Sequence, residues 1–171
     1  KAGGAAFGSE PKLAAEVVSQ ARLGTNKTLI AKLTPNVTSV AEVALACQRA
    51  GADVLSLINT VLAMAIDPIS RRPRLGAVVG GLSGPAIKPI AVRMVWEVAQ
   101  AVQIPVIGMG GIMDVNDALE FFLAGAQAVA VGTANFIDPQ TPLKIVQGIN
   151  AYLEQNGFSS INEIVGAMVN E

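Results

Sequence analysis

The stretch PVIGMGGIMDVNDALEFFLAGAQAVAVGT, residues 105–133, contains the pattern that decides the fold of this chain. It begins and ends with nearly continuous apolar runs, Pro105–Met109 and Ala128–Val131, which are typical of parallel strands buried on both faces. A helical pattern at Asp114–Leu123 separates the runs, and a glycine-containing loop follows each of them. In a (βα)8 barrel the loops after strands seven and eight bind phosphate, so we expect these two strands to be the seventh and eighth.

The same alternation extends upstream, where two further apolar runs predict strands at Thr28–Leu33 and Val54–Ile58. A long loop follows the second of these strands, ahead of the helix that begins at Pro85. Strands that alternate with helices predict a parallel sheet with right-handed crossovers. Helices are predicted at Pro11–Leu23 (with Ser9 as its N-cap), Ser39–Ala50, Pro85–Val102, Asp114–Leu123, Pro139–Glu154 and, as a short last helix, Ile161–Val169.

The predicted fold class is therefore α/β, with residues 1–171 as a single domain that forms the C-terminal half of a (βα)8 TIM barrel, strands five to eight. Four strands do not close an eight-stranded barrel, so we expect the N-terminal half to be missing from this chain. The alternative is an open doubly wound sheet, which would carry a glycine fingerprint after its first strand. That strand instead ends in Leu33-Thr34-Pro35-Asn36.

Composition narrows the functional classes. The net charge of −1 gives no basic footprint for nucleic acid, and no run is long and apolar enough to predict a membrane span. Histidine is absent, which excludes sites that need imidazole, and the single cysteine, Cys47, cannot form an internal disulfide. The glycine-rich start, Lys1–Ser9, has no apolar core of a signal peptide. We expect a cytoplasmic protein.

Two glycine loops predict an anion site. Gly110-Gly111 ends one strand and Gly132-Thr133 ends the next, so bare backbone N–H groups and one hydroxyl converge at the same edge of the sheet. The alternative is that these glycines only form tight turns. The pattern predicts phosphate without identifying the nucleotide that carries it.

Polar side chains at the ends of the first two strands suggest contacts with a ring. Lys32 lies within an apolar strand, where we expect it to be buried and to point into the barrel mouth toward an anionic or electron-rich partner. The alternative is an exposed lysine that protects a sheet edge. Asn59 and Thr60 follow the second strand and have the donors and acceptors that read a polar ring, although both are also common in turns.

The stretch Gly80–Pro89, GGLSGPAIKP, combines glycine freedom with a proline at the start of a helix. We expect it to lie close to a flat ligand rather than to act as a linker. The basic stretch Ser70–Arg74 ahead of it has no interleaved aromatic residues, which favours a solvated hairpin or turn over a nucleic-acid patch. Cys47 lies in a helical pattern and is expected to be buried and inert.

Together these motifs closely resemble class 1B dihydroorotate dehydrogenase, an FMN-dependent barrel that oxidises dihydroorotate to orotate in pyrimidine synthesis. The resemblance extends over essentially the whole chain. The motifs that carry it, in order, are Lys32-Leu33-Thr34-Pro35-Asn36, Ile58-Asn59-Thr60, GGLSGPAIKP at 80–89, Ile107-Gly108-Met109-Gly110-Gly111 and Val131-Gly132-Thr133-Ala134.

The resemblance implies a role for each matching residue. Lys32 would bond the flavin ring, Ile58 would contact FMN through its backbone, and Gly84 would lie against the cofactor. The ribityl phosphate would be held by Gly110, Gly111, Gly132 and Thr133, and the pyrimidine would be bound by Asn59 and Thr60. No metal site is implied in this chain.

The resemblance also implies a catalytic base that this chain does not contain. The family uses a cysteine in an Asn-x-x-Cys-Pro-Asn motif, which is expected immediately before Lys1, together with an upstream lysine and an Asn-rich substrate loop. Cys47 matches no catalytic position. The thiolate would remove the C5 proton of dihydroorotate while hydride leaves C6 for the flavin. Lys32 would stabilise negative charge on the reduced flavin.

The partners implied by the resemblance are a second catalytic subunit, in a homodimer, and an electron-transfer subunit that carries [2Fe–2S] and FAD and reduces NAD. Other FMN barrels remain alternatives, namely the fumarate-linked class 1A enzyme and the pyrimidine-reducing barrel of dihydropyrimidine dehydrogenase. A non-redox phosphate-binding barrel would share the two glycine loops but has no need for Lys32. A non-catalytic half-barrel that binds a partner is the remaining alternative.

Overall fold

A four-stranded parallel sheet forms the centre of the chain, whose computed structural model describes residues 7–169. Its strands are β1 (Ile30–Lys32), β2 (Val54–Leu57), β7 (Val106–Met109) and β8 (Ala128–Ala130), each paired with the next strand in parallel. The four predicted strands are thus confirmed, one or two residues shorter at their ends. The spatial order follows the chain order, as in a barrel, without the reversal that marks a doubly wound sheet.

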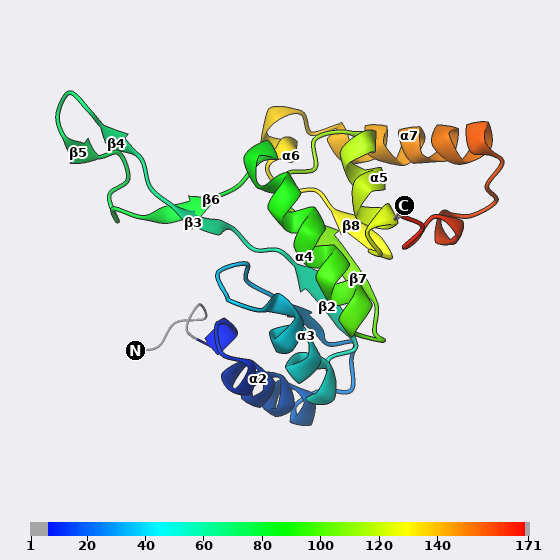
Figure 1. The fold of residues 1–171 in the computed structure, drawn as a ribbon, viewed down its shortest axis with the longest axis horizontal. Coiled ribbons are helices and arrows are strands. Elements are labelled where there is room, and N and C mark those ends of the chain that lie inside the picture. The colour runs from blue at the N-terminus through cyan, green and yellow to red at the C-terminus, as the bar shows by residue number, and fades with distance from the viewer. Residues whose placement is uncertain (1–6, 170–171) are drawn as a thin grey trace.

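The helices pack against one another in chain order around the sheet (Figure 1). α2 contacts α3, α3 contacts α4, α4 contacts α5, and α5 contacts α7. Their bounds are α2 (Pro11–Leu23), α3 (Val40–Arg49), α4 (Lys88–Ala101), α5 (Val115–Leu123), α6 (Ala134–Ile137) and α7 (Thr141–Asn156), with 3-10 turns η1 (Pro85–Ile87) and η2 (Ile161–Glu163). This arrangement is the C-terminal half of a (βα)8 barrel.

One face of the sheet is sealed by these helices. Leu55, Leu57 and Val106 are at most 1% exposed, and a Cβ added to Gly108 would lie 2.5 Å from the Phe121 ring of α5. On the opposite face Ile30 is 49% exposed, and Lys32 and Ala128 are exposed as well. In a closed barrel this second face is the interior.

Most helix ends follow the sequence signals. Ser39 and Asp114 cap α3 and α5 by accepting the N–H groups of Glu42 and Asp117. Gly51 follows α3 with a φ of 102°, a left-handed conformation that favours glycine.

The predicted start of α2 needs a correction. Glu10, not Ser9, is the N-cap, with Pro11 in the first turn, and the Glu10 side chain forms no capping hydrogen bond. The helix predicted from Pro85 is a 3-10 turn followed by α4.

The two predicted C-terminal helices also differ from the structure. α7 begins at Thr141 rather than Pro139, because Asp138 accepts the N–H groups of Gln140 and Thr141 in a turn that precedes the helix. The last helix, Ile161–Val169, is wrong: only η2 forms, and Gly166 with a φ of 70° lies where the helix would continue.

The long loop predicted after β2 is instead an arm of two antiparallel hairpins that extends away from the body (Figure 1). β3 (Val61–Ala63) pairs with β6 (Gly80–Leu82), and β4 (Ile66–Asp67) pairs with β5 (Arg72–Pro73). The hairpin predicted around Ser70–Arg74 is therefore confirmed. The arm exposes several large apolar side chains: Leu62, Met64, Ile66, Ile69, Leu75, Val78, Val79 and Leu82.

The core lies between the sheet and its helices, and Cys47 is part of it, as predicted. Leu119, Phe122 and Ile164 form a smaller cluster beneath the C-terminal segment. In the part of the chain that the structure describes, no helix has the length and apolar character needed to cross a membrane. Residues 1–6 of the glycine-rich start lie outside the described residues.

Candidate functional site

A cavity of about 470 Å³ opens at the carboxyl ends of the sheet strands. This volume is within the range of small-molecule sites, roughly 300–1,000 Å³. All of the residues predicted for the site line this one cavity, although they come from five separate segments: Lys32, Ile58, Asn59, Thr60, Gly84, Gly110, Gly111, Gly132 and Thr133. The structure thus brings them together, while the role of each one stays a prediction.

The loop after β7 needs its glycines for backbone reasons. Gly110 and Gly111 have φ values of 126° and 78°, which residues with a side chain rarely adopt. A Cβ on Gly111 would lie 2.8 Å from the Gly84 carbonyl oxygen and from the Lys88 backbone nitrogen. The loop after β7 therefore touches the loop ahead of α4, with no side chain between the two.

The loop after β8 completes the same corner of the cavity. The Thr133 hydroxyl donates to the Ser83 hydroxyl at 2.9 Å, and Thr133 is also the nearest neighbour of a Cβ built on Gly84. A Cβ on Gly132 would meet no atom within 4 Å, so this backbone faces open space. The Asn135 side chain donates to the Gly132 carbonyl at 3.1 Å. Three loops with small residues and hydroxyl groups thus converge, as an anion cradle requires.

Asn59 and Thr60 are held at the entrance of the arm. The Asn36 amide donates to the Thr60 carbonyl at 3.1 Å, and its oxygen accepts the Leu62 N–H at 2.9 Å. A Cβ on Gly81 would lie 2.2 Å from the Thr60 hydroxyl oxygen, so only glycine fits against this side chain. Asn59 is exposed, so its amide is available to a ligand.

Lys32 lines the cavity, but the expectation that it is buried is wrong. β1 is the edge of the sheet, and the face that carries the Lys32 side chain has no helix over it. Among the described residues that line the cavity, Lys32 is the only one with an ionisable side chain. A cation at this position is therefore free to meet an anionic or electron-rich ligand.

Cys47 is not part of this cavity and is 2% exposed within α3. Burial raises the pKa of its thiol, which disfavours the thiolate that acid–base chemistry needs. A catalytic role for Cys47 is thus excluded on position and on chemistry.

Sequence reasoning assigned no role to Ser83 or Asn36, although both stand inside quoted motifs. Phe136 and Met113 also line the cavity, and Phe136 is 93% exposed. For Asn36, a polar residue that follows a proline after a strand end was an available signal, because such residues tie loops together. The exposure of Phe136 depends on the turn of α6, which the sequence did not predict.

Comparisons with known proteins agree on one family. A family model described as dihydroorotate dehydrogenase matches residues 1–153. The catalytic subunit of dihydroorotate dehydrogenase B (NAD(+)) from Geotalea uraniireducens is 60% identical over 169 residues, which are 99% of this chain and 55% of that protein. The protein of the same name from Bacteroides thetaiotaomicron is 58% identical over 168 residues, again 55% of its length.

A solved structure gives the same architecture. The DHODH of Eimeria tenella, crystallised in complex with ferulenol, superposes with a TM-score of 0.76 at 23% identity, over 92% of this chain and 48% of that one. The chain described here spans about half the length of the relatives that it matches.

Proposed function

Because this chain belongs to the dihydroorotate dehydrogenase family, we propose that it is the cofactor- and substrate-binding half of an NAD-linked dihydroorotate dehydrogenase catalytic subunit. The complete protein oxidises dihydroorotate to orotate in de novo pyrimidine synthesis. The observation that carries the proposal is the single cavity into which every residue predicted for the site converges. The names of the relatives from Geotalea uraniireducens and Bacteroides thetaiotaomicron include NAD(+), which favours NAD over fumarate as the electron acceptor.

The cavity fits FMN by the chemistry of its two ends. At one end the glycine loops and the hydroxyl groups of Ser83 and Thr133 offer donors without side chains in the way, which suits a phosphate. Gly110, Gly111, Gly132 and Thr133 would hold that phosphate, and Gly84 would lie against the cofactor. At the other end Lys32 and the backbone at Ile58 would contact the flavin ring. Bound FMN supplies the hydride acceptor of the reaction.

The substrate would be bound by Asn59 and Thr60. Amide and hydroxyl groups match the alternating carbonyl and N–H edges of a pyrimidine ring. The Asn36 hydrogen bond and the close fit of Gly81 hold Thr60, and the Asn59 N–H donates to the Leu33 carbonyl, which limits the entropy lost on binding. Lys32 would stabilise negative charge near the flavin ring.

The proton at C5 of dihydroorotate needs a base, and the described residues that line the cavity offer no carboxylate, thiol or imidazole. We assign this step to the family cysteine, expected upstream of Lys1, in the N-terminal half that would complete the barrel. The exposed face of the sheet supports such a completion, since strands there would bury Ile30 and surround Lys32.

The remaining partners follow the family. We expect a homodimer of catalytic subunits in the cytoplasm and an electron-transfer subunit with FAD and a [2Fe–2S] cluster that reduces NAD. The relatives are named catalytic subunits, which supports a separate partner subunit.

The test is a visible spectrum of the complete polypeptide, recorded before and after dihydroorotate is added without oxygen. We expect a flavin band that bleaches on addition. A flavin band that stays oxidised would retain the FMN barrel and remove the substrate. A colourless protein that takes up no FMN would favour a non-redox phosphate-binding barrel.

A further inference from the structure

Two of the loops that form the glycine-rich end of the cavity also contact each other through their backbones. One leads through η1 into α4, and the other connects β7 to α5. The backbone nitrogen and Cβ of Lys88 and the carbonyl oxygen of Gly84 would each lie 2.8 Å from a Cβ on Gly111. Backbone thus packs on backbone at this point, so a small displacement of either loop would open the contact.

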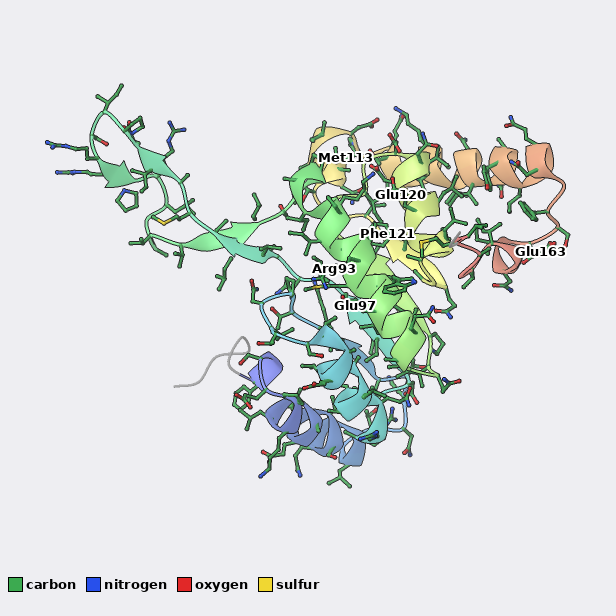
Figure 2. The ribbon with its side chains drawn as sticks, in the orientation of Figure 1. Arg93, Glu97, Met113, Glu120, Phe121 and Glu163 are labelled. Atoms are coloured by element: carbon green, nitrogen blue, oxygen red, sulfur yellow. The ribbon has the colours of Figure 1, made fainter. Side chains whose placement is uncertain are left out.

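An ionic link bridges the same two loops. Lys88 Nζ donates to Asp117 Oδ1 at 2.7 Å and to Glu120 Oε1 at 2.6 Å, both on α5. The other carboxylate oxygen, Asp117 Oδ2, accepts the backbone N–H of Met113 at 2.8 Å. A single carboxylate therefore holds the ammonium at the start of α4 and the backbone at the end of the β7 loop. Glu120 lies along α5, and Met113 lies in the loop before it (Figure 2).

The charges in this link are fully engaged. The hydrogen bonds to Asp117 and then Glu120 raise the pKa of Lys88 above its ordinary value, so its ammonium stays protonated. Partial burial raises the pKa of Asp117, but the bonds from Lys88 and Met113 lower it by more. The Lys88 side chain is 24% exposed and that of Asp117 is 14% exposed.

Neither Lys88 nor Asp117 lines the cavity. One cation with two carboxylates also has a net negative charge, which would not attract a phosphate. The link therefore acts neither by direct contact with a ligand nor by attracting its phosphate. The link instead acts through geometry, because it sets the separation of Gly84 from Gly110 and Gly111, which do line the cavity.

We infer that Lys88, through Asp117, is a positioning residue that holds the two loops together so that their N–H groups converge on the phosphate of the flavin cofactor. The inference rests on the proposed function. It predicts a specific defect, because a loosened link would weaken recognition of the phosphate end and leave the contacts at Lys32 and Ile58 intact.

The test compares two flavins that differ only in the phosphate. Apo-protein of the complete polypeptide and its Lys88→Met variant are titrated with FMN and with riboflavin, and dissociation constants are measured by flavin fluorescence. We expect Lys88→Met to weaken FMN binding about tenfold to hundredfold, the size expected when a supporting contact is lost, and riboflavin binding by less than about threefold. A general structural role would weaken both flavins equally, and that outcome would overturn the inference.

Three further variants keep the test decisive. Arg93→Met breaks the Arg93–Glu97 pair further along the same helix (Figure 2), and it should leave both dissociation constants unchanged. Lys88→Arg should retain the preference for FMN, because a guanidinium can bridge both carboxylates. Asp117→Asn keeps an acceptor for Met113 but removes the one ionic partner of Lys88 that also holds the β7 loop, so it should reproduce the FMN-specific loss even if Lys88→Met fails to fold.

Failure of the proposed function has a different signature. A wild-type protein that binds neither flavin would remove the flavin site itself. A wild-type protein that prefers FMN, with Lys88→Met and Asp117→Asn showing the same preference, would remove only the positioning role.

Discussion

The two faces of the central sheet have opposite surroundings, although the same short strands form both. On the helix-covered face Leu55, Leu57 and Val106 are almost completely buried, and α5 packs so closely that Gly108 has no space for a side chain. On the open face Ile30, Lys32 and Ala128 are exposed. The apolar side chains buried on the helix-covered face therefore stabilise the chain, whereas the ligand site lies at the carboxyl end of the open face.

The largest loss of stability is expected from a substitution that creates a cavity in the helix-covered face of the sheet. Phe121→Ala should destabilise the chain by about 3–5 kcal/mol, because the ring is fully buried against Gly108. The measurement is the free energy of unfolding from urea denaturation. As the control, Phe136→Ala removes a ring that is 93% exposed and should change stability by less than about 0.5 kcal/mol. Equal losses in the two variants would contradict the division between the faces.

A change on the open face should act on chemistry instead. Lys32→Ala should slow flavin reduction by dihydroorotate about a hundredfold, as when one group that stabilises charge is removed, in the complete protein. Stability should change little, because Lys32 is exposed and no hydrogen bond or ion pair of its side chain with the described residues is recorded. Anaerobic stopped-flow absorbance measures the rate. Unchanged reduction kinetics would remove the assigned role.

Two substitutions in the glycine loops separate an effect on FMN binding from an effect on stability. Gly132→Val should weaken FMN binding by about tenfold or more, equivalent to roughly 1.4 kcal/mol, because its side chain would project into open space where the phosphate is proposed. Gly111→Val is the matched contrast, since its side chain would collide with Gly84 and Lys88 and should also lower the melting temperature. If Gly132→Val retained full FMN affinity, the cradle would have to lie elsewhere.

A weaker effect is expected on the way the free energy of unfolding depends on pH. The pKa of Asp117 in the folded chain lies below its ordinary value of 3.8, because the bonds from Lys88 and Met113 outweigh its partial burial. Its contribution to stability is therefore present above that ordinary value and is lost as pH falls through the lower folded pKa. Asp117→Asn should flatten the acid limb of a plot of unfolding free energy against pH. An identical acid limb in both proteins would show that Asp117 does not contribute.

The sequence predicted the positions of the strands well, because each of them is a nearly continuous apolar run. The expected burial on both faces was wrong for β1 and β8, whose open face is exposed in this chain. The helical patterns over Ser39–Ala50 and Asp114–Leu123 predicted α3 and α5, and in the structure the Ser39 and Asp114 side chains cap these helices. Within the arm only the hairpin around Ser70–Arg74 was predicted. The pairing of Val61–Ala63 with Gly80–Leu82 was not, since such short strands have no clear apolar alternation of their own. The final helix failed at Gly166, where a left-handed backbone outweighs the apolar residues around it.

The sequence predicted which residues line the site, but it did not predict the exposure of Lys32. The residues chosen do line one cavity, because the carboxyl ends of parallel strands meet at one edge. The expected burial of Lys32 was wrong, because burial depends on which elements flank an edge strand, and local sequence does not contain that information. The partnership of Lys88 with Asp117 and Glu120 joins positions about thirty residues apart and needed the folded geometry.

The arm between β2 and α4 lengthens the segment that is closed when β2 pairs with β7, and this affects how the chain folds. Pairing β2 with β7 brings Leu55 to Val106 and so closes a segment roughly twice as long as the one closed when β7 pairs β8, Ile107 with Ala128. Each doubling of a closed loop costs only about 0.6 kcal/mol in chain entropy. We therefore expect the β2–β7 pairing to be the last of the sheet to form, with little change in the equilibrium stability of the sheet. Over evolutionary time this crossover can gain or lose residues at low cost, so its length can diverge while the glycine loops beside it stay in place.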